Sequence, residues 1–294
     1  MDFDKQTSEI RALCNRLFDE DKIDLVFAYT DGDLGDGALI PFIARSADDV
    51  DRIKWGDRCW QNLAPYLHGR KERVAILAKA CDARAVVQFI IENQLERDKV
   101  FIIGVDCPGM ADADGAPRPG CGECTVRIAP VFDARIEDDR VTKGEPIKGT
   151  VPLIGAPCVP GDSSSGSLDR FREEIDKCIL CYSCRQACYG CYCKTCFIQR
   201  DMPDWQPAEI DAGTKMTFHI GRAMHLAGRC VECGACEAAC ASDVNVRYII
   251  KEATDFIEEM YDYKTGMDFD ATQAMLTHKF EDKEVGFFGG EGHE

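Results

Sequence analysis

The segment from Cys178 to Phe197, CILCYSCRQACYGCYCKTCF, holds seven cysteines in twenty residues. Thiols at such a density serve as disulfide partners, as metal ligands or as reactive groups. The whole chain has 18 cysteines in 294 residues, and eleven of them lie between Cys178 and Cys240. Because thiols used only for packing would be spread along the chain, this clustering favours metal ligation.

Two segments repeat one cysteine spacing, C-x2-C-x2-C-x3-C. The first run consists of Cys178, Cys181, Cys184 and Cys188, and the second of Cys230, Cys233, Cys236 and Cys240. This spacing is typical of [4Fe–4S] proteins, in which the last cysteine of each run binds the cluster of the other run. We therefore predict two crossed ligand sets: Cys178, Cys181, Cys184 and Cys240 for one cluster, and Cys230, Cys233, Cys236 and Cys188 for the other. Zinc is the alternative, but it would use paired C-x2-C motifs with four ligands in total.

Ten further cysteines lie outside the two runs. Three of them, Cys107, Cys121 and Cys124, lie in a loop rich in glycine and proline, which is unsuited to core packing. We predict that this loop helps to hold a further [4Fe–4S] cluster. The number of remaining thiols allows one or two such additional clusters.

Cys191, Cys193 and Cys196 follow the first run too closely to bind the same four-iron cluster. We hypothesise that these thiols face the N-terminal half and help to bind a cluster at the interface, completed by Cys81 or Cys158. The alternative is that they are small buried residues in a tight loop.

The composition limits the class of protein. Apolar residues make up 45% and charged residues 30% of the chain, which is typical of a globular protein. The formal net charge of −17 argues against nucleic acid and anionic membranes as partners, because both attract basic surfaces. The first residues show no secretory signal, and no run of about 18 apolar residues predicts a membrane span. We therefore expect a cytoplasmic protein, in which disulfides are rare.

Residues 1–160 alternate between strand-like and helix-like segments. Short apolar runs rich in β-branched residues predict strands at 23–29, 37–45, 73–79 and 100–106. A helix is predicted at 81–98 with Asp82 as its N-cap, and another is predicted after Ser46. This alternation predicts an α/β domain with a mixed or parallel sheet. A helix near the N-terminus would place Cys14 in the core, where free cysteine is common.

Residues 168–250 carry both cysteine runs and predict a mostly α-helical ferredoxin domain with two clusters. Between the runs, segment 217–229 has apolar residues at helical spacing, and another helix is predicted at 246–263. The apolar residues with this spacing are Phe218, Ile220, Met224 and Leu226. A Gly/Ser/Pro-rich linker is predicted at 159–169. The tail from 251 to 294 has twelve acidic and four basic residues, and it is either solvated or lies on a partner subunit.

A second candidate site lies in KACDAR, where the predicted strand at 73–79 ends and a helix begins. Free backbone amides at a helix N-terminus attract phosphate groups or an anionic cluster. The candidate cofactor-binding residues are therefore Lys79, Asp82 and Arg84. By contrast, DGDLGDG at 31–37 has the spacing G-x2-G-x-G and precedes a strand, so it predicts an acidic turn and not a dinucleotide site. No set of side chains predicts acid–base or nucleophilic catalysis.

The stretches at 62–110, from NLAPYL to DCPGM, and at 121–133, CGECTVRIAPVFD, accompany the two cysteine runs. In this combination the chain resembles the coenzyme F-420 (deazaflavin) hydrogenase/dehydrogenase beta-subunit family. The likeness extends from about residue 50 to about residue 250 and is greatest for shorter members with a C-terminal double ferredoxin run. The region between the runs also resembles the α-helical ferredoxin domains of fumarate reductase-type and heterodisulfide reductase-type electron carriers.

This resemblance implies an iron–sulfur subunit that relays single electrons within a multisubunit redox complex of anaerobic metabolism. The implied partners are heterodisulfide reductase-like, formate dehydrogenase-like or hydrogenase-like subunits. Some members bind a flavin, so FAD or FMN is a further expected cofactor. The alternative function is a flavin-dependent dehydrogenase subunit that oxidises a reduced deazaflavin or nicotinamide. The chain differs from full-length flavin-binding members in being shorter and in carrying its ferredoxin run at the C-terminus.

Overall fold

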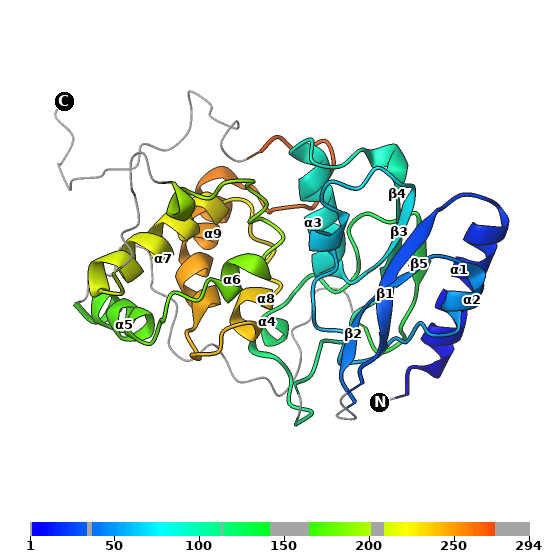
Figure 1. Cartoon of the computed structure of the whole chain (residues 1–294), viewed down its shortest axis with the longest axis horizontal. Coiled ribbons are helices and arrows are strands. Elements are labelled where there is room, and N and C mark those ends of the chain that lie inside the picture. Colours follow the sequence, from blue (N-terminus) through cyan, green and yellow to red (C-terminus); the bar gives the residue numbers. More distant parts are fainter. Residues whose placement is uncertain (1, 34–36, 113, 142–164, 201–208, 274–294) are drawn as a thin grey trace.

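The computed structural model describes residues 2–33, 37–112, 114–141, 165–200 and 209–273 of the chain. Two parts lie side by side (Figure 1). Residues up to 141 form an α/β half around a sheet, and residues 165–261 form a helical half that carries both cysteine runs. Residues 262–273 then return to the α/β half.

A five-stranded sheet forms the centre of the α/β half. Its strands, in spatial order, are β2 (Leu39–Ala44), β1 (Leu25–Asp31), β3 (Val74–Ala78), β4 (Val100–Val105) and β5 (Ala134–Ile136). β1 and β2 are antiparallel, whereas β1, β3, β4 and β5 run parallel to their neighbours. Every residue of β3 is buried, as expected for a central strand covered on both faces. The predicted α/β class with a mixed sheet is therefore confirmed, with β5 as an additional short strand.

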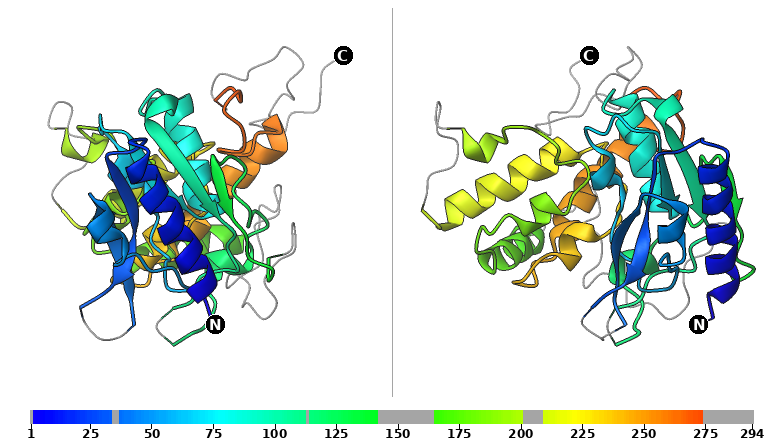
Figure 2. Two further views of the ribbon diagram at one scale, coloured as in Figure 1. Left: turned by 90° about the vertical axis from the view of Figure 1, so that its right-hand side faces the viewer. Right: turned by 45° about the vertical axis from the view of Figure 1, so that its right-hand side comes forward.

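Helices cover both faces of this sheet. The helical elements of the α/β half are α1 (Asp4–Asp19), α2 (Ala47–Val50), η1 (Ala64–Leu67), α3 (Ala80–Ile91), η2 (Arg97–Lys99) and α4 (Pro119–Gly122). α1 lies on the outer face of the sheet, while α3 lies on the face toward the helical half (Figure 2). Cys14 of α1 is fully buried in the core, as predicted. The glycine-rich stretch predicted as a turn joins β1 to β2, with residues 34–36 outside the described ones.

The starts of two helices differ from their predictions. Asp82 is the third residue of α3 and not its N-cap, a position that Lys79 occupies. There Asp82 Oδ2 accepts a hydrogen bond from the backbone N of Lys79 (2.9 Å), which is the part of the acid in a capping box. Ser46 precedes α2, as predicted, but its side chain makes no capping hydrogen bond. The helix is only four residues long and ends at Val50.

The helical half is built around α7. Its elements are α5 (Ser165–Asp176), α6 (Ser183–Gln186), η3 (Phe197–Gln199), α7 (Ala212–Leu226), α8 (Ala235–Ala238) and α9 (Val246–Tyr261). α5 and α9 both pack on α7, and the short α6 packs against the short α8. Among the described residues, no helix has the length and apolar character that a bilayer crossing requires.

Two sequence predictions for this half need correction. α5 begins at Ser165, so part of the predicted linker at 159–169 is helical, and residues 159–164 lie outside the described ranges. In α7, only two of the four apolar residues face the core. Phe218 and Leu226 are buried, whereas Ile220 is 47% and Met224 is 68% exposed.

The end of the described chain ties the two halves together. Arg84 of α3 donates from Nε to the carbonyl O of Thr265 (2.8 Å) and from Nη1 to the carbonyl O of Val231 (3.4 Å). Tyr263 Oη lies 3.1 Å from Gln88 Oε1 on the same helix. Gly266 has φ +72°, and a Cβ there would lie 2.1 Å from the carbonyl O of Arg84. Only glycine allows this close approach.

Candidate iron–sulfur sites

The two cysteine runs fold into loops with the same backbone geometry. Leu180 and Tyr182 in the first run, and Glu232 and Gly234 at the equivalent positions of the second, all have φ between +53° and +71°. This left-handed conformation is uncommon for residues other than glycine. Its recurrence at equivalent positions shows that the shared spacing selects one loop conformation. Each loop then enters a one-turn helix, α6 or α8, which carries the third cysteine.

In both loops a backbone amide points at the sulfur of the first cysteine. The N–H of Leu180 donates to Cys178 Sγ at 3.3 Å, and the N–H of Glu232 donates to Cys230 Sγ at 3.3 Å. A hydrogen bond to sulfur favours the thiolate over the thiol, and the thiolate is the form that binds iron. Both loops therefore favour the thiolate form of their first cysteine through the same backbone hydrogen bond.

The last cysteine of each run lies beside the other run. A cavity of about 20 Å³ is lined by Cys230, Cys233, Cys236 and Cys188, which we call the second-run site. Burial raises the pKa of Cys178 and of Cys184, and the neighbouring thiol of Cys240 raises both further. We call Cys178, Cys181, Cys184 and Cys240 the first-run site. Iron ligation by these two sets stays a prediction.

The two sites differ in their access to solvent. Cys181 of the first-run site is exposed, and its neighbour Ile179 is 55% exposed. In the second-run site none of the four cysteines is exposed, and Cys236 is buried. The first-run site thus reaches the surface, while the second-run site lies inside the molecule.

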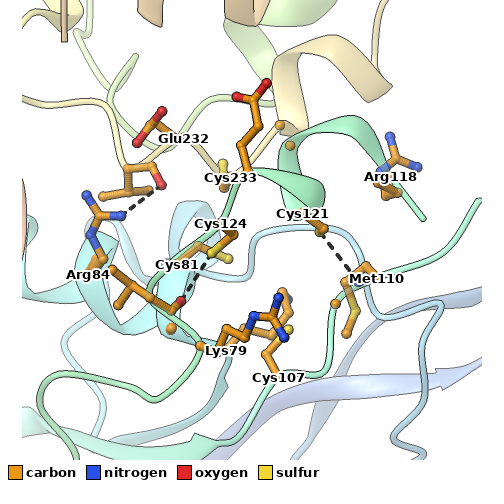
Figure 3. Close-up of a pocket in the computed structure, with 18 of the residues that line it drawn as sticks. Lys79, Cys81, Arg84, Cys107, Met110, Arg118, Cys121, Cys124, Glu232 and Cys233 are labelled. Carbon is orange, nitrogen blue, oxygen red and sulfur yellow. Dashed lines mark hydrogen bonds between the residues drawn. The ribbon is translucent and has the colours of Figure 1, made fainter. Parts of the chain in front are cut away.

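Four other cysteines line one cavity at the C-terminal ends of two parallel strands (Figure 3). Cys81 lies in the first turn of α3, directly after β3, and Cys107 follows β4 by two residues. Cys121 lies in α4 and Cys124 just after it. Ligand sites of parallel sheets form at this edge, because the loops that follow neighbouring strands meet there. We call these four residues the sheet-edge site.

The sheet-edge cavity has a volume of about 70 Å³. One water needs about 10–15 Å³ by a comparable measure, so the cavity accommodates a group of several atoms. Cys121 Sγ accepts a hydrogen bond from the N–H of Met110 (3.4 Å), and Cys124 Sγ donates to the carbonyl O of Val126 (3.2 Å). Cys233 lines both this cavity and that of the second-run site, so the two sites are adjacent.

The three residues predicted to bind a cofactor are held by partners within the protein. Lys79 Nζ forms a fully buried ion pair with Asp82 Oδ2 (2.7 Å). Burial alone would lower the pKa of Lys79, but the Asp82 carboxylate beside it holds that pKa well above its usual range. Arg84 donates to the backbone carbonyls described above. Lys79 and Arg84 line the sheet-edge cavity, so all three residues stabilise the loops around that cavity.

The extra thiols of the first run do not line the sheet-edge cavity. The thiol of Cys191 hydrogen-bonds to that of Cys188, and this bond lowers the pKa of Cys188 to about 6 in spite of burial. Cys193 is exposed, and Cys196 precedes η3. Cys158 lies outside the described residues. The cysteine that joins Cys107, Cys121 and Cys124 is Cys81, one of the two partners that we proposed for an interface cluster.

Tyrosines of the same segment make the contact with the α/β half. The rings of Tyr189 and Tyr192 both pack edge-on against Phe89 of α3, each with centroids 5.6 Å apart. Tyr192 Oη donates to Glu92 Oε2 (2.5 Å), and Arg229 binds both oxygens of Glu92, at 2.5 and 2.8 Å. A half-buried polar network thus joins the helical half to the end of α3.

Burial raises the pKa of most of these thiols in the absence of iron. It raises the pKa of Cys184 to about 11 and that of Cys233 to about 12. Burial also raises the pKa of Cys81 and of Cys107, with neighbouring acidic groups adding to the shift. A buried thiolate needs a positive partner. Metal binding at these sites must therefore release protons, which couples metal affinity to pH.

Three buried arginines test whether these cavities suit an anionic group. Arg127, Arg222 and Arg247 each have guanidinium nitrogens with no hydrogen-bond partner among the described residues. Arg127 and Arg247 line the sheet-edge cavity, and Arg222 and Arg247 line that of the second-run site. Unsatisfied buried donors are costly, so a cavity lined by them favours an anion with acceptor atoms. A [4Fe–4S] cluster bound by four thiolates is such an anion.

The donor sets also differ from those of a single metal ion. Within the described ranges, no three His, Cys, Asp or Glu side chains are grouped closely enough to hold one ion. A four-iron cluster binds one cysteine per iron, so its ligands stand further apart than the ligands of one ion. Ligation of a cluster instead of zinc stays a prediction.

The buried arginines were not predicted from the sequence. Arg222 lies four residues after Phe218 and four before Leu226, and all three are buried on one side of α7. An arginine between apolar residues at this spacing is a sequence signal for a buried charge. Arg247 follows Val246 at the start of α9 and gives no comparable signal.

A relative with a known name is similar to most of the chain. No protein-family model matches the chain. The sequence is 21% identical to the F420-dependent formate dehydrogenase subunit beta of Methanocaldococcus jannaschii over an alignment of 352 residues, which covers 88% of this chain and 91% of the relative. The resemblance predicted from the sequence is thereby confirmed: over most of its length the chain is similar to the beta subunit of an F420-linked formate dehydrogenase.

Proposed function

We propose that the protein is an iron–sulfur electron-transfer subunit of a multisubunit oxidoreductase, with three [4Fe–4S] clusters. The observation that carries the proposal is the cavity shared between halves: four cysteines of the α/β half line it together with Cys233 of the helical half. A [4Fe–4S] cluster supplies one-electron transfer with little movement of its ligands. The protein's own part is to hold three ligand sets in contact and to exclude water from two of them.

The order of the sites supports a relay. The sheet-edge site adjoins the second-run site, because Cys233 lines both cavities. The second-run site in turn adjoins the first-run site, because the thiol of Cys236 is close enough to Cys184 to raise its pKa. Only the last of the three has an exposed cysteine, Cys181, beside the exposed Ile179. We infer that a partner subunit docks there. Its class is heterodisulfide reductase-like, formate dehydrogenase-like or hydrogenase-like, and the name of the relative favours a formate dehydrogenase.

Iron and acid-labile sulfide counts test the proposal. Anaerobically prepared protein should hold about twelve of each per chain, four for each cluster. Cys107→Ala should lower both counts by about four, because Cys107 lines the sheet-edge cavity. Cys59→Ala is the matched control: Cys59 is also a buried cysteine of the α/β half but does not line that cavity. A count of eight in the unaltered protein, with both runs fully occupied, contradicts the third cluster.

The second candidate function is a flavin-dependent dehydrogenase subunit that oxidises reduced deazaflavin. The observation that favours it is the relative's name, since that protein is an F420-dependent enzyme. Absorbance of FAD or FMN in the purified native complex distinguishes the two functions. Stoichiometric flavin that remains with this chain after the complex is separated supports the dehydrogenase, and its absence supports the relay.

A further inference from the structure

Arg222 of α7 occupies the boundary between the first-run and second-run sites. Its Nη2 donates to the carbonyl O of Cys184, a residue of the first-run site, at 3.1 Å. Its side chain also lines the cavity of the second-run site. The residue is 3% exposed, although it is an arginine. One buried guanidinium therefore contacts both ligand sets.

Among the described residues, this guanidinium makes no ion pair with a carboxylate. The acidic groups close enough to influence it are thiols of the two sites and of Cys191. Arg247 is the contrasting case, because it is equally buried but pairs with Glu123 (3.1 Å) and Glu237 (3.4 Å). The largest electrostatic partners of Arg222 are thus thiols of both sites, and its Nε and Nη1 have no hydrogen-bond partner in the described part of the chain.

His219, one turn earlier on α7, does not share this role. Its pKa is lowered to about 4, first by burial and then by the charge of Arg222, so the imidazole is neutral at physiological pH. An arginine keeps its charge at any such pH. Arg222 is therefore the fixed positive charge at this boundary.

We propose that Arg222 is a shared electrostatic residue that raises the reduction potentials of both ferredoxin-type clusters together. The inference rests on the proposed function. A fixed positive charge favours the added electron, and in a poorly solvated interior its effect on each cluster is only weakly screened. Because one guanidinium serves two sites, its removal must change two potentials, whereas a residue specific to one cluster would change one.

Redox titration followed by paramagnetic resonance tests this in the full chain. Arg222→Gln should lower the equilibrium constant for reduction of both clusters at least tenfold, which is a downward shift of 59 mV for a one-electron couple. Arg185→Gln is the control: Arg185 lies in α6 between Cys184 and Cys188 but is partly exposed, so solvent screens its charge and both potentials should stay nearly unchanged. A shift of one potential only, or of neither, overturns the inference.

Arg222→Lys separates charge from geometry. A lysine keeps the positive charge, so both potentials should stay close to those of the unaltered protein. If Arg222→Gln fails to retain iron, Arg222→Lys still decides: two nearly unchanged potentials support the shared charge, and a tenfold or larger fall in the equilibrium constant for reduction, with the charge kept, contradicts it. Failure of the proposed function looks different, because unaltered protein would then lack the clusters to be titrated.

Discussion

The first and second cysteine runs share one spacing and one loop conformation, yet they occupy different environments. Before the first run, Lys177 pairs with Glu174 on the surface, with side chains 44% and 17% exposed. At the equivalent position before the second run, Arg229 reaches across to Glu92 of the α/β half, with side chains 22% and 7% exposed. The shared spacing therefore accounts for the common conformation of the two loops. The flanking residues determine whether the site faces solvent or the other half.

The largest expected effect comes from replacing the last cysteine of each run with alanine, one run at a time. Cys188→Ala should remove the cluster of the second-run site, and Cys240→Ala that of the first-run site, because each residue lies beside the opposite run. Each variant should lose about four irons and one paramagnetic signal. If Cys188→Ala instead removes the signal of the cluster that contains Cys178, the crossed assignment is wrong.

Replacing the basic residue that directly precedes each run gives the next largest effect. Arg229→Gln removes the positive partner of the nearly buried Glu92 carboxylate, although Tyr192 still donates a hydrogen bond to it. This should lower the free energy of unfolding by about 3 kcal/mol. Lys177→Gln removes the equivalent residue of the first run, where solvent screens the pair, and should cost less than about 1 kcal/mol. Anaerobic denaturant titration followed by circular dichroism measures both. Equal losses would contradict the expectation that the more buried ion pair contributes more to stability.

Sensitivity to oxygen gives a further test of the difference in solvent access between the sites. Cys181 places the first-run site at the surface, whereas the second-run and sheet-edge sites have no exposed cysteine. The cluster at the first-run site should therefore decay in air several-fold faster than the other two. The order of decay of the three paramagnetic signals measures this, and simultaneous decay contradicts the difference in access.

The smallest effect concerns the fourth residue after the first cysteine of each run. Gly234→Ala forces a side chain into the left-handed region without a clash, since the nearest atom to a Cβ there is Glu237 Oε2 at 3.9 Å. The strain should cost about 1 kcal/mol. Tyr182→Gly at the equivalent position relieves that strain but loses the ring contact with Phe218, centroids 5.0 Å apart, so the two effects should nearly cancel. Thermal unfolding of the two variants compares them.

Local patterns made much of this molecule predictable. The four predicted strands correspond to β1–β4, because each is a short apolar run rich in β-branched residues. The helix at 246–263 corresponds to α9, which spans Val246–Tyr261. β5 was missed because its three residues, ARI, are too few to show a period.

The candidate sites also differ in how far they could be predicted from the sequence. The spacing of each run is a local feature, so the two loops could be expected from sequence. The sheet-edge site is assembled from residues that follow two different strands, together with α4, and no sequence pattern predicts that Cys81 meets the other three thiols there. The hypothesis that the first run's extra cysteines help to bind a cluster at the interface stays a prediction. Tyr189 and Tyr192 supply the contact with the α/β half, and large aromatic residues contribute more contact area than thiols do.

The hydrogen bonds of Arg84 to two carbonyls that follow it far along the sequence have a consequence for synthesis of the protein. Val231 follows Arg84 by 147 residues and Thr265 by 181, so the wall of the sheet-edge cavity is supplied late in synthesis. At roughly 5–20 residues per second, the ribosome needs on the order of ten to thirty seconds to reach them. During that interval the sheet-edge cavity lacks the part of its wall that Val231 provides. Under the proposed function, a cluster inserted in that interval would enter before Gly266 packs against α3.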